Sequence, residues 1–189
     1  MPEIEDDTEI SLTGAKVFEE FSEAKALGIL TKPVVVGPFT FLRLAKFTGG
    51  KRAADFAGDI VRAYSLLVEK LASLGAEWIQ LDEPALVMDQ TAENTALFEK
   101  LYSEILKQKK HTKILLQTYF GDIRDCCGEA AALDFDGIGL DFVEGKENFA
   151  WIRKNGFPDR KVLFAGLVNG KNIWRNDYAK TVSYTHLTL

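Results

Sequence analysis

The chain has 189 residues, 47% of them hydrophobic, so it can bury one sizeable core but is short for two ordinary domains. Its formal net charge of −5 argues against a nucleic-acid or anionic-membrane partner, because both repel an acidic surface. No apolar run approaches the ~18 residues of a membrane span, and two adjacent cysteines, Cys126 and Cys127, suit a reducing cytoplasm better than a disulfide or a metal site.

The N-terminal part of the chain predicts one helix and one strand. Residues 1–12 are acidic and weakly patterned, which favours a loop. Apolar residues at helical spacing then predict a helix over 14–27, which Gly28 ends. A β-branched run between Pro33 and Gly37 predicts a short buried parallel strand, and its exit has the sequence G-P-F-T-F-L.

A long helix separates this strand from the next one. Two glycines at 49 and 50 indicate a turn, and the apolar periodicity after them predicts a helix over about 52–74 that ends at Gly75. The apolar stretch Trp78–Leu81 then predicts the second strand.

Two adjacent carboxylates follow this second strand. Asp82 and Glu83 come directly after it, and Pro84 prevents the strand from continuing because proline lacks the backbone donor. Side chains at the carboxyl ends of parallel strands line the crevice where ligands bind, so Asp82 is a candidate site residue. The alternative is that Asp82 caps the following loop or pairs with a cation. Glu83, as the next residue, should point elsewhere.

The rest of the chain alternates helices and strands. One aspartate, Asp122, is placed to open a helix, and another, Asp141, ends a strand as Asp82 does. The predicted helices cover 92–108, 122–133 and a short segment around 149–156, and the predicted strands are Ile114–Thr118, Gly137–Asp141 and Val162–Gly166.

This alternation predicts an α/β fold with a parallel sheet whose strand ends lie on one side. Five strands are expected where a closed eight-unit barrel has eight and typically needs about 250 residues. The sequence therefore predicts an incomplete (β/α)8 TIM-type barrel, or an open doubly wound sheet. No glycine-rich dinucleotide turn is present, which argues against the open-sheet cofactor folds.

The last eight residues, Val182–Leu189, do not continue this pattern. They resemble the translation of a transposon-derived sequencing adaptor, and we interpret them as a non-native tail. We therefore assign residues 1–181 to the barrel segment and exclude His186 from any site.

Polar residues at the strand exits could carry chemistry. Asp82 and Asp141 could act as the acid and base of a glycosidase-like barrel, or bind an ammonium group. Metal binding is poorly supported, since the remaining histidine, His111, lies in a lysine-rich loop. Several aromatic residues could stack on a flat ligand or pack in the core: Phe39, Phe41, Tyr119, Phe120 and Trp174.

Four motifs resemble one known family. They are K-P-V-V-V-G-P-F-T-F-L at 32–42, I-Q-L-D-E-P-A-L-V at 79–87, L-L-Q-T-Y-F-G at 115–121 and G-L-V-N-G-K-N-I-W-R at 166–175. Their order and spacing are similar to those of cobalamin-independent methionine synthase. That family has two β/α barrels that arose by duplication, and it transfers a methyl group from 5-methyltetrahydropteroyl-polyglutamate to homocysteine. Its zinc lies in the C-terminal barrel.

The resemblance also indicates which half this is. In the zinc-bearing half, the strand after the D-E-P motif carries a His-x-Cys ligand pair, and the matching positions here are Gln117 and Tyr119. Residues 1–181 therefore resemble the later part of the N-terminal barrel, and zinc is expected in the absent half, not in this chain. In the catalytic half the D-E-P aspartate holds the amino group of homocysteine. For Asp82 that role is an inference across the duplication.

The resemblance implies that this segment belongs to a methyltransferase and is inactive alone. Its expected role is to bind the folate tail and to pack as a scaffold against the C-terminal catalytic barrel. A stand-alone barrel hydrolase using Asp82 and Asp141 is the alternative. The candidate substrate-binding residues are Asp82, Glu83, Asp141, Asn169 and Trp174.

Overall fold

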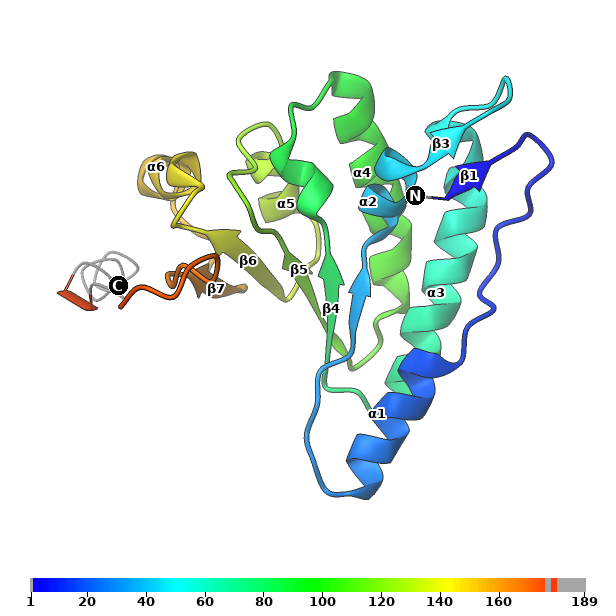
Figure 1. The fold of residues 1–189 in the computed structure, drawn as a ribbon, viewed down its shortest axis with the longest axis horizontal. Helices are drawn as coiled ribbons and strands as arrows, with labels where there is room; N and C mark the ends of the chain where they lie inside the picture. The colour runs from blue at the N-terminus through cyan, green and yellow to red at the C-terminus, as the bar shows by residue number, and fades with distance from the viewer. Residues whose placement is uncertain (1, 176–177, 180–189) are drawn as a thin grey trace.

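A computed structural model describes residues 2–175 and 178–179, so the proposed tail at 182–189 lies outside the described residues. Its main sheet has five parallel strands in the order β2-β4-β5-β6-β7 (Figure 1). Because the strands adjoin in chain order and helices lie between them, the predicted incomplete β/α barrel is confirmed. The strands are β2 Val34–Val36, β4 Trp78–Asp82, β5 Lys113–Gln117, β6 Gly137–Asp141 and β7 Val162–Gly166.

Helices α3 and α4 pack against each other beside the sheet, and α6 lies at the opposite end of the molecule, near β6 and β7 (Figure 1). No described helix is long and apolar enough to cross a membrane. The helices are α1 Lys16–Ala26, α2 Pro38–Leu44, α3 Ala57–Ser73, α4 Ala92–Ile105, α5 Cys127–Ala132 and α6 Lys146–Asn155, and the 3-10 turns are η1 Ala53–Phe56, η2 Pro84–Val87 and η3 Leu106–Gln108.

The two faces of the sheet differ in what covers them. On β4, Ile79 and Leu81 are fully buried in the main core, and we call their side the covered face. Trp78, Gln80 and Asp82 alternate with them and are only partly buried, on what we call the open face. Along β4 the pleat therefore divides the side chains between a packed core and a surface without a full cover.

Glycines of β6 shape the open face. A Cβ at Gly137 would come within 2.9 Å of the Phe164 ring and 3.2 Å of the Trp78 ring, so glycine lets these two rings meet across the sheet. Their centroids lie 5.5 Å apart, edge to face. At Gly139 the missing side chain gives the Gln117 amide its space.

Most predicted elements lie where the sequence placed them, but the helix predicted over 122–133 begins only at Cys127. Asp122 does not cap it. Its carboxylate instead accepts a 2.6 Å hydrogen bond from Nε of Arg124, and the backbone N–H of Ile123 donates to Asn148. These contacts hold 122–126 as an irregular loop.

Two features were missing from the sequence prediction. The exit motif after β2 forms helix α2, whose first residue is Pro38, a position that suits proline because the N–H there has no helical partner. Residues 1–12 were expected to be a loop, but β1, Glu3–Ile4, pairs in parallel with β3, Lys46–Phe47. This pairing joins segments too far apart for local pattern to reveal.

The prediction that β2 is buried was wrong. Val34 is 49% exposed and Val36 is 53% exposed. In the described part of the chain β2 pairs with β4 alone, so it is an edge strand, and its open-face side chains have no neighbouring strand beside them.

Candidate functional site

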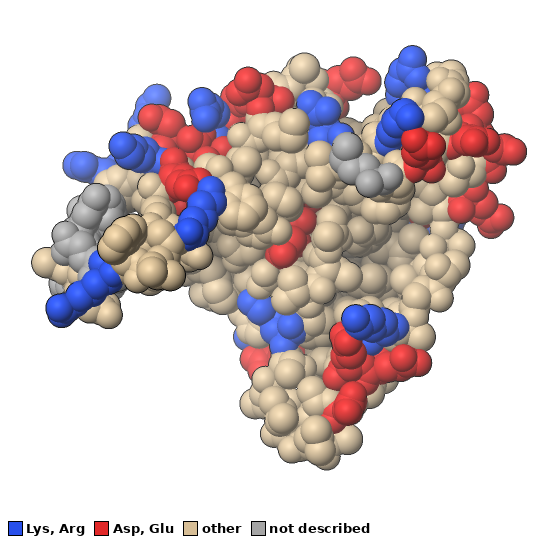
Figure 2. All heavy atoms as spheres, viewed as in Figure 1, with Lys and Arg blue, Asp and Glu red and all other residues tan. Residues whose placement is uncertain are grey.

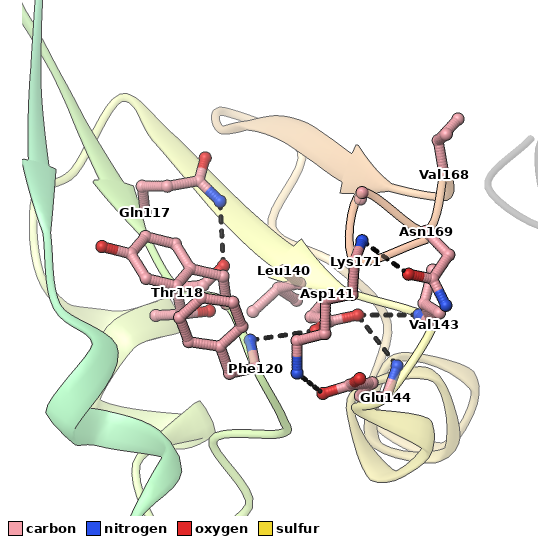
Figure 3. Close-up of a pocket in the computed structure, with 13 residues that line it drawn as sticks. Gln117, Thr118, Phe120, Leu140, Asp141, Val143, Glu144, Val168, Asn169 and Lys171 are labelled. Atoms are coloured by element: carbon pink, nitrogen blue, oxygen red, sulfur yellow. Dashed lines mark hydrogen bonds and ion pairs between the residues drawn. The ribbon is translucent and has the colours of Figure 1, made fainter. Parts of the chain in front are cut away.

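A cavity of about 310 Å³ lies at the carboxyl ends of β5, β6 and β7 (Figure 3). Its walls come from the three segments that follow these strands, around Tyr119, Asp141 and Asn169. This is the side of a parallel sheet on which α/β proteins bind ligands, so we treat the cavity as the candidate site.

Asp141 holds two walls of the pocket in place. Its Oδ2 accepts a 3.0 Å hydrogen bond from the Phe120 backbone N–H. Its Oδ1 accepts bonds of 2.8 and 2.9 Å from the N–H groups of Val143 and Glu144. The carboxylate therefore organises the loops after β5 and β6, which agrees with a loop-capping role more than with free acid–base chemistry.

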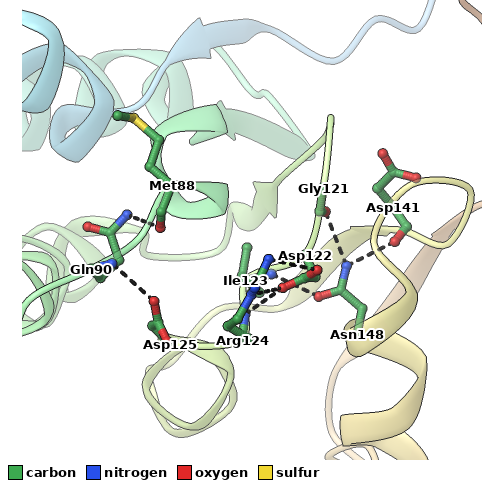
Figure 4. A network of polar contacts seen from close by, with 9 residues as sticks. All are labelled: Met88, Gln90, Gly121, Asp122, Ile123, Arg124, Asp125, Asp141 and Asn148. Atoms are coloured by element: carbon green, nitrogen blue, oxygen red, sulfur yellow. Dashed lines mark hydrogen bonds and ion pairs between the residues drawn. The ribbon is translucent and has the colours of Figure 1, made fainter.

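Asn148, from α6, reinforces the same junction from behind (Figure 4). It is fully buried, its Oδ1 accepts from Ile123 N–H at 3.0 Å, and its Nδ2 donates to the Asp141 carbonyl at 2.9 Å. At Gly145 a Cβ would lie only 2.5 Å from that carbonyl, so glycine is required for this approach. Asn148 thus joins α6 to the segments after β5 and β6 beneath the pocket.

Phe120 forms an aromatic wall in an unusual backbone conformation. Its φ is 74°, a left-handed value that bulky residues rarely adopt. The ring stays 59% exposed and packs edge-on against Tyr119, with centroids 4.7 Å apart. The hydrogen bond to Asp141 holds the backbone in this conformation.

Lys171 closes the pocket from the loop after β7. Its Nζ lies 2.7 Å from Oε2 of Glu144 and 4.6 Å from the centroid of the Phe120 ring. Asn169 accepts the Lys171 backbone N–H at 2.9 Å, which turns the chain at this point. The lysine and glutamate side chains are 51% and 37% exposed, so this ion pair remains open to solvent.

Asp82 lies on the open face next to this pocket. Its two oxygens accept hydrogen bonds from Gln80 Nε2 at 2.7 Å and from the Tyr119 hydroxyl at 3.2 Å. Burial raises the pKa of Tyr119, and the charge of Asp82 raises it further. Partial burial lowers the pKa of Lys32, and the negative charge of Asp82 opposes this lowering. Tyr119 therefore connects Asp82 to the wall of the pocket.

Glu83 points to the covered face, as the alternation predicted. It has no exposed surface, and it accepts hydrogen bonds from Phe39 N–H at 2.9 Å, Thr40 N–H at 2.6 Å and the Tyr102 hydroxyl at 2.6 Å. Burial raises its pKa to about 7, against the lowering effect of these bonds. In this conformation Glu83 joins β4 to α2 and α4 and cannot touch a ligand, so its place among the candidate binding residues was wrong.

The structure does not pair Asp82 with Asp141. Asp82 is in register with Gln117 and Gln117 with Gly139, so Asp141 lies two strands away and two residues further along. Strand spacing of about 4.8 Å and a rise of about 3.3 Å per residue place the two Cα atoms roughly 12 Å apart. Both carboxylate oxygens of Asp141 also accept backbone N–H groups, so Asp141 is not free to act as the acid or base partner of Asp82. The hydrolase alternative is therefore not supported.

Of the two remaining candidate binding residues, one lines the pocket and one does not. Asn169 lines the pocket, whereas Trp174 is 79% exposed and lies outside its lining. Sequence reasoning missed Glu144 and Lys171 as site residues, because their contact joins two loops that no motif spacing connects. The signal available for both was their position just after a strand.

The described residues do not fit a zinc site. Among residues 2–175 and 178–179, no three His, Cys, Asp or Glu side chains lie close enough to hold a metal. His111 is exposed, and burial raises the pKa of Cys126 to about 11 and that of Cys127 to about 12, which disfavours the thiolates that zinc needs. No chemical step of this segment is therefore assigned to a metal.

Comparisons with known proteins agree on one family. The family described as "Cobalamin-independent synthase, N-terminal domain" matches residues 1–188. A 5-methyltetrahydropteroyltriglutamate–homocysteine methyltransferase of Streptococcus suis is 57% identical over 97% of the chain, and one of Lactococcus lactis subsp. lactis is 52% identical over 96%. The chain spans 24% of the length of each.

Solved structures show the same fold. A putative vitamin-B12-independent methionine synthase from Listeria monocytogenes superimposes with a TM-score of 0.75 at 18% identity, covering 96% of this chain and 61% of that one. A B12-independent methionine synthase from Shewanella sp. W3-18-1, solved with selenomethionine, gives a TM-score of 0.66 at 14% identity, covering 89% and 55%.

Proposed function

The chain belongs to the family of the cobalamin-independent synthase N-terminal domain, and we propose that it is part of a methyltransferase that makes methionine. The reaction moves a methyl group from 5-methyltetrahydropteroyl-polyglutamate to homocysteine. The observation that carries this proposal is the identity of 57% to a methyltransferase of that description along nearly the whole chain. We place the protein in the cytoplasm, where its adjacent cysteines remain reduced.

Within that enzyme, this segment is proposed to bind the folate tail and support the catalytic barrel, with zinc in the absent C-terminal half. The absence of a metal-binding cluster among the described residues agrees with this division. A tail of glutamates needs cations near the strand ends. Lys171 lies there, and its exposed ion pair with Glu144 is weak enough to exchange for a ligand carboxylate.

The test is to express the full-length protein that contains this segment and assay homocysteine methylation without cobalamin. We expect methionine to form, and a triglutamate donor to have a lower KM than a monoglutamate donor. No methylation alongside an active control enzyme would refute the methyltransferase proposal. Equal KM values for the two donors would refute tail binding alone.

The division of zinc between the halves has its own measurement. Elemental analysis of the dialysed 189-residue chain should find no stoichiometric zinc, because Gln117 and Tyr119 are not usual zinc ligands. About one zinc per chain would show that this segment carries a metal site.

A further inference from the structure

The chain contains two Asn-Gly pairs, Asn155–Gly156 and Asn169–Gly170, and the structure holds them in different environments. Such a pair is reactive in an unfolded chain, because glycine has no side chain to shield its backbone nitrogen and that nitrogen can attack the side-chain amide carbon of the preceding asparagine. In a folded protein the attack depends on the freedom of the nitrogen and of the asparagine side chain. The hydrogen bonds of the two pairs can therefore be compared directly.

The first pair is protected by helix α6. The Gly156 N–H donates to the Ile152 carbonyl at 2.8 Å and closes the last turn of the helix. The Asn155 Nδ2 donates to the Trp151 carbonyl at 2.9 Å. Attack at Asn155 must break both hydrogen bonds, since the glycine nitrogen and the asparagine side chain have to turn toward each other. This pair should therefore be stable while the protein is folded.

The second pair lies in the loop after β7, at the wall of the pocket. Gly170 is exposed, and its N–H has no hydrogen-bond partner among the residues that the structure describes. The Asn169 Oδ1 accepts the Lys171 backbone N–H at 2.9 Å (Figure 3). Negative charge develops on this oxygen during the attack, so the N–H group that already lies there favours the reaction. Neither protection found at Asn155 is present at Asn169.

We propose that Asn169 is a site of spontaneous deamidation. The Gly170 nitrogen loses its proton to solvent and bonds to Asn169 Cγ, the Cγ–Nδ2 bond breaks, and Nδ2 takes up a proton from water and leaves as ammonia. The product is a cyclic succinimide. Water then opens the ring at either carbonyl, which gives an aspartate or an isoaspartate whose main chain runs through Cβ and Cγ. The net reaction consumes water and releases ammonia, and nothing is oxidised or reduced.

Deamidation changes the charge of the pocket wall. The lining contains the acids Asp141 and Glu144 and the base Lys171, and conversion adds a carboxylate at position 169 beside that lysine. An isoaspartate also lengthens the main chain and disrupts the turn at Lys171. A ligand carboxylate then meets more negative charge. This consequence rests on the proposed function, since it concerns the glutamate tail, whereas the deamidation itself does not.

The test is to incubate the full-length protein at mildly alkaline pH and to follow each asparagine by peptide mass spectrometry with detection of isoaspartate. Asn169 should convert about tenfold faster than Asn155 or more, because each net hydrogen bond that must break at Asn155 corresponds to roughly fivefold. Asn172 is the matched control for the turn. Its Oδ1 accepts the Trp174 N–H at 3.0 Å, but the branched Ile173 follows it and shields the nitrogen, so Asn172 should stay intact.

Urea and one substitution separate the fold from the local sequence. In urea Asn155 and Asn169 should convert at similar rates, since unfolding removes the contacts of α6 and both keep their glycine. Gly170→Ala should slow conversion at Asn169 by about threefold or more. It should leave the fold intact, because nothing lies within 4 Å of the added Cβ. Equal rates for Asn155 and Asn169 in the folded protein, or an intact Asn169 where the unfolded chain converts, would overturn the inference.

Kinetics of the incubated protein separate this inference from the proposed function. The KM for a triglutamate donor should rise in the incubated wild-type protein and rise less in the incubated Gly170→Ala variant, and an unchanged KM after conversion would refute the effect on the tail. Deamidation at Asn169 in a protein that makes no methionine supports the site and refutes the methyltransferase. Methylation by a protein whose Asn169 stays intact, while the unfolded chain deamidates, supports the enzyme and refutes the site.

Discussion

The adjacent carboxylates Asp82 and Glu83 lie on opposite faces of the sheet and differ in burial and in hydrogen-bond partners. On the covered face Glu83 has no exposed surface and accepts two backbone N–H groups and the Tyr102 hydroxyl. On the open face Asp82 is partly exposed, and within the described ranges it accepts hydrogen bonds from two side chains, Gln80 and Tyr119. A shift of one residue along a strand therefore separates a structural acid from one that can meet a ligand.

The difference teaches that neighbours in sequence need not share a role. The covered face uses a carboxylate to bind the first turn of α2, and Gly37 is needed there because any side chain would collide with Glu83. The open face keeps its acid in a polar row with Gln80 and Tyr119. Mutation, pH and association can each test this division.

The largest expected effect concerns the open face as a whole. Edge strands β2 and β7 have free sides in the described part of the chain, and Val34, Val36 and Val162 are about half exposed. Uncovered apolar strands associate, so we expect the 189-residue chain to be oligomeric or partly unfolded. Analytical ultracentrifugation with thermal melting measures this. A monodisperse monomer with a sharp transition at an ordinary Tm would show that the open face needs no cover.

Substitution of the two acids should sharpen the comparison. Glu83→Ala leaves buried donors at Phe39, Thr40 and Tyr102 without an acceptor, and each such group costs about 1–3 kcal/mol, so we expect a loss of about 3 kcal/mol or more. Asp82→Ala should cost about 1 kcal/mol or less, because solvent can reach its partners. Urea denaturation of both variants measures the difference, and equal losses would contradict the division between the faces.

The smallest of the three effects is a pH dependence. The pKa of Glu83 rises from 4.5 to about 7 in the folded chain, so the folded state binds the proton more tightly. The resulting stabilisation is fully present below pH 4.5 and is lost as pH rises through about 7, by at most about 3 kcal/mol. The other titratable groups around Glu83 are Tyr64, Tyr102 and Asp82.

Urea midpoints between pH 5 and pH 8 test this sign. Glu83→Gln cannot titrate and should show a flatter profile than the wild-type chain. An unchanged slope in that variant would assign the pH dependence to other groups.

The strands could be predicted from the sequence because they are short apolar or β-branched runs bounded by Gly, Pro or acids. The alternation of side chains along β4 also correctly predicted that Glu83 points away from the face of Asp82. Local pattern could not reveal β1 pairing with β3, since that depends on a distant partner. It also could not reveal Lys171 meeting Glu144, or the left-handed backbone of Phe120. Those features arise where loops from different strands converge, and the site depends on them.

In the five-stranded sheet the spatial order of the strands matches their order along the chain, and this bears on how the protein is made. During translation β4 can add to β2 once it leaves the ribosome, and each later strand then finds its neighbour already synthesised. Within this five-stranded sheet no strand inserts between two that were made before it, whereas β1 must wait for β3. A nascent chain can therefore add the strands of this sheet in the order in which they are synthesised, so the strand made last provides the edge that the next strand joins.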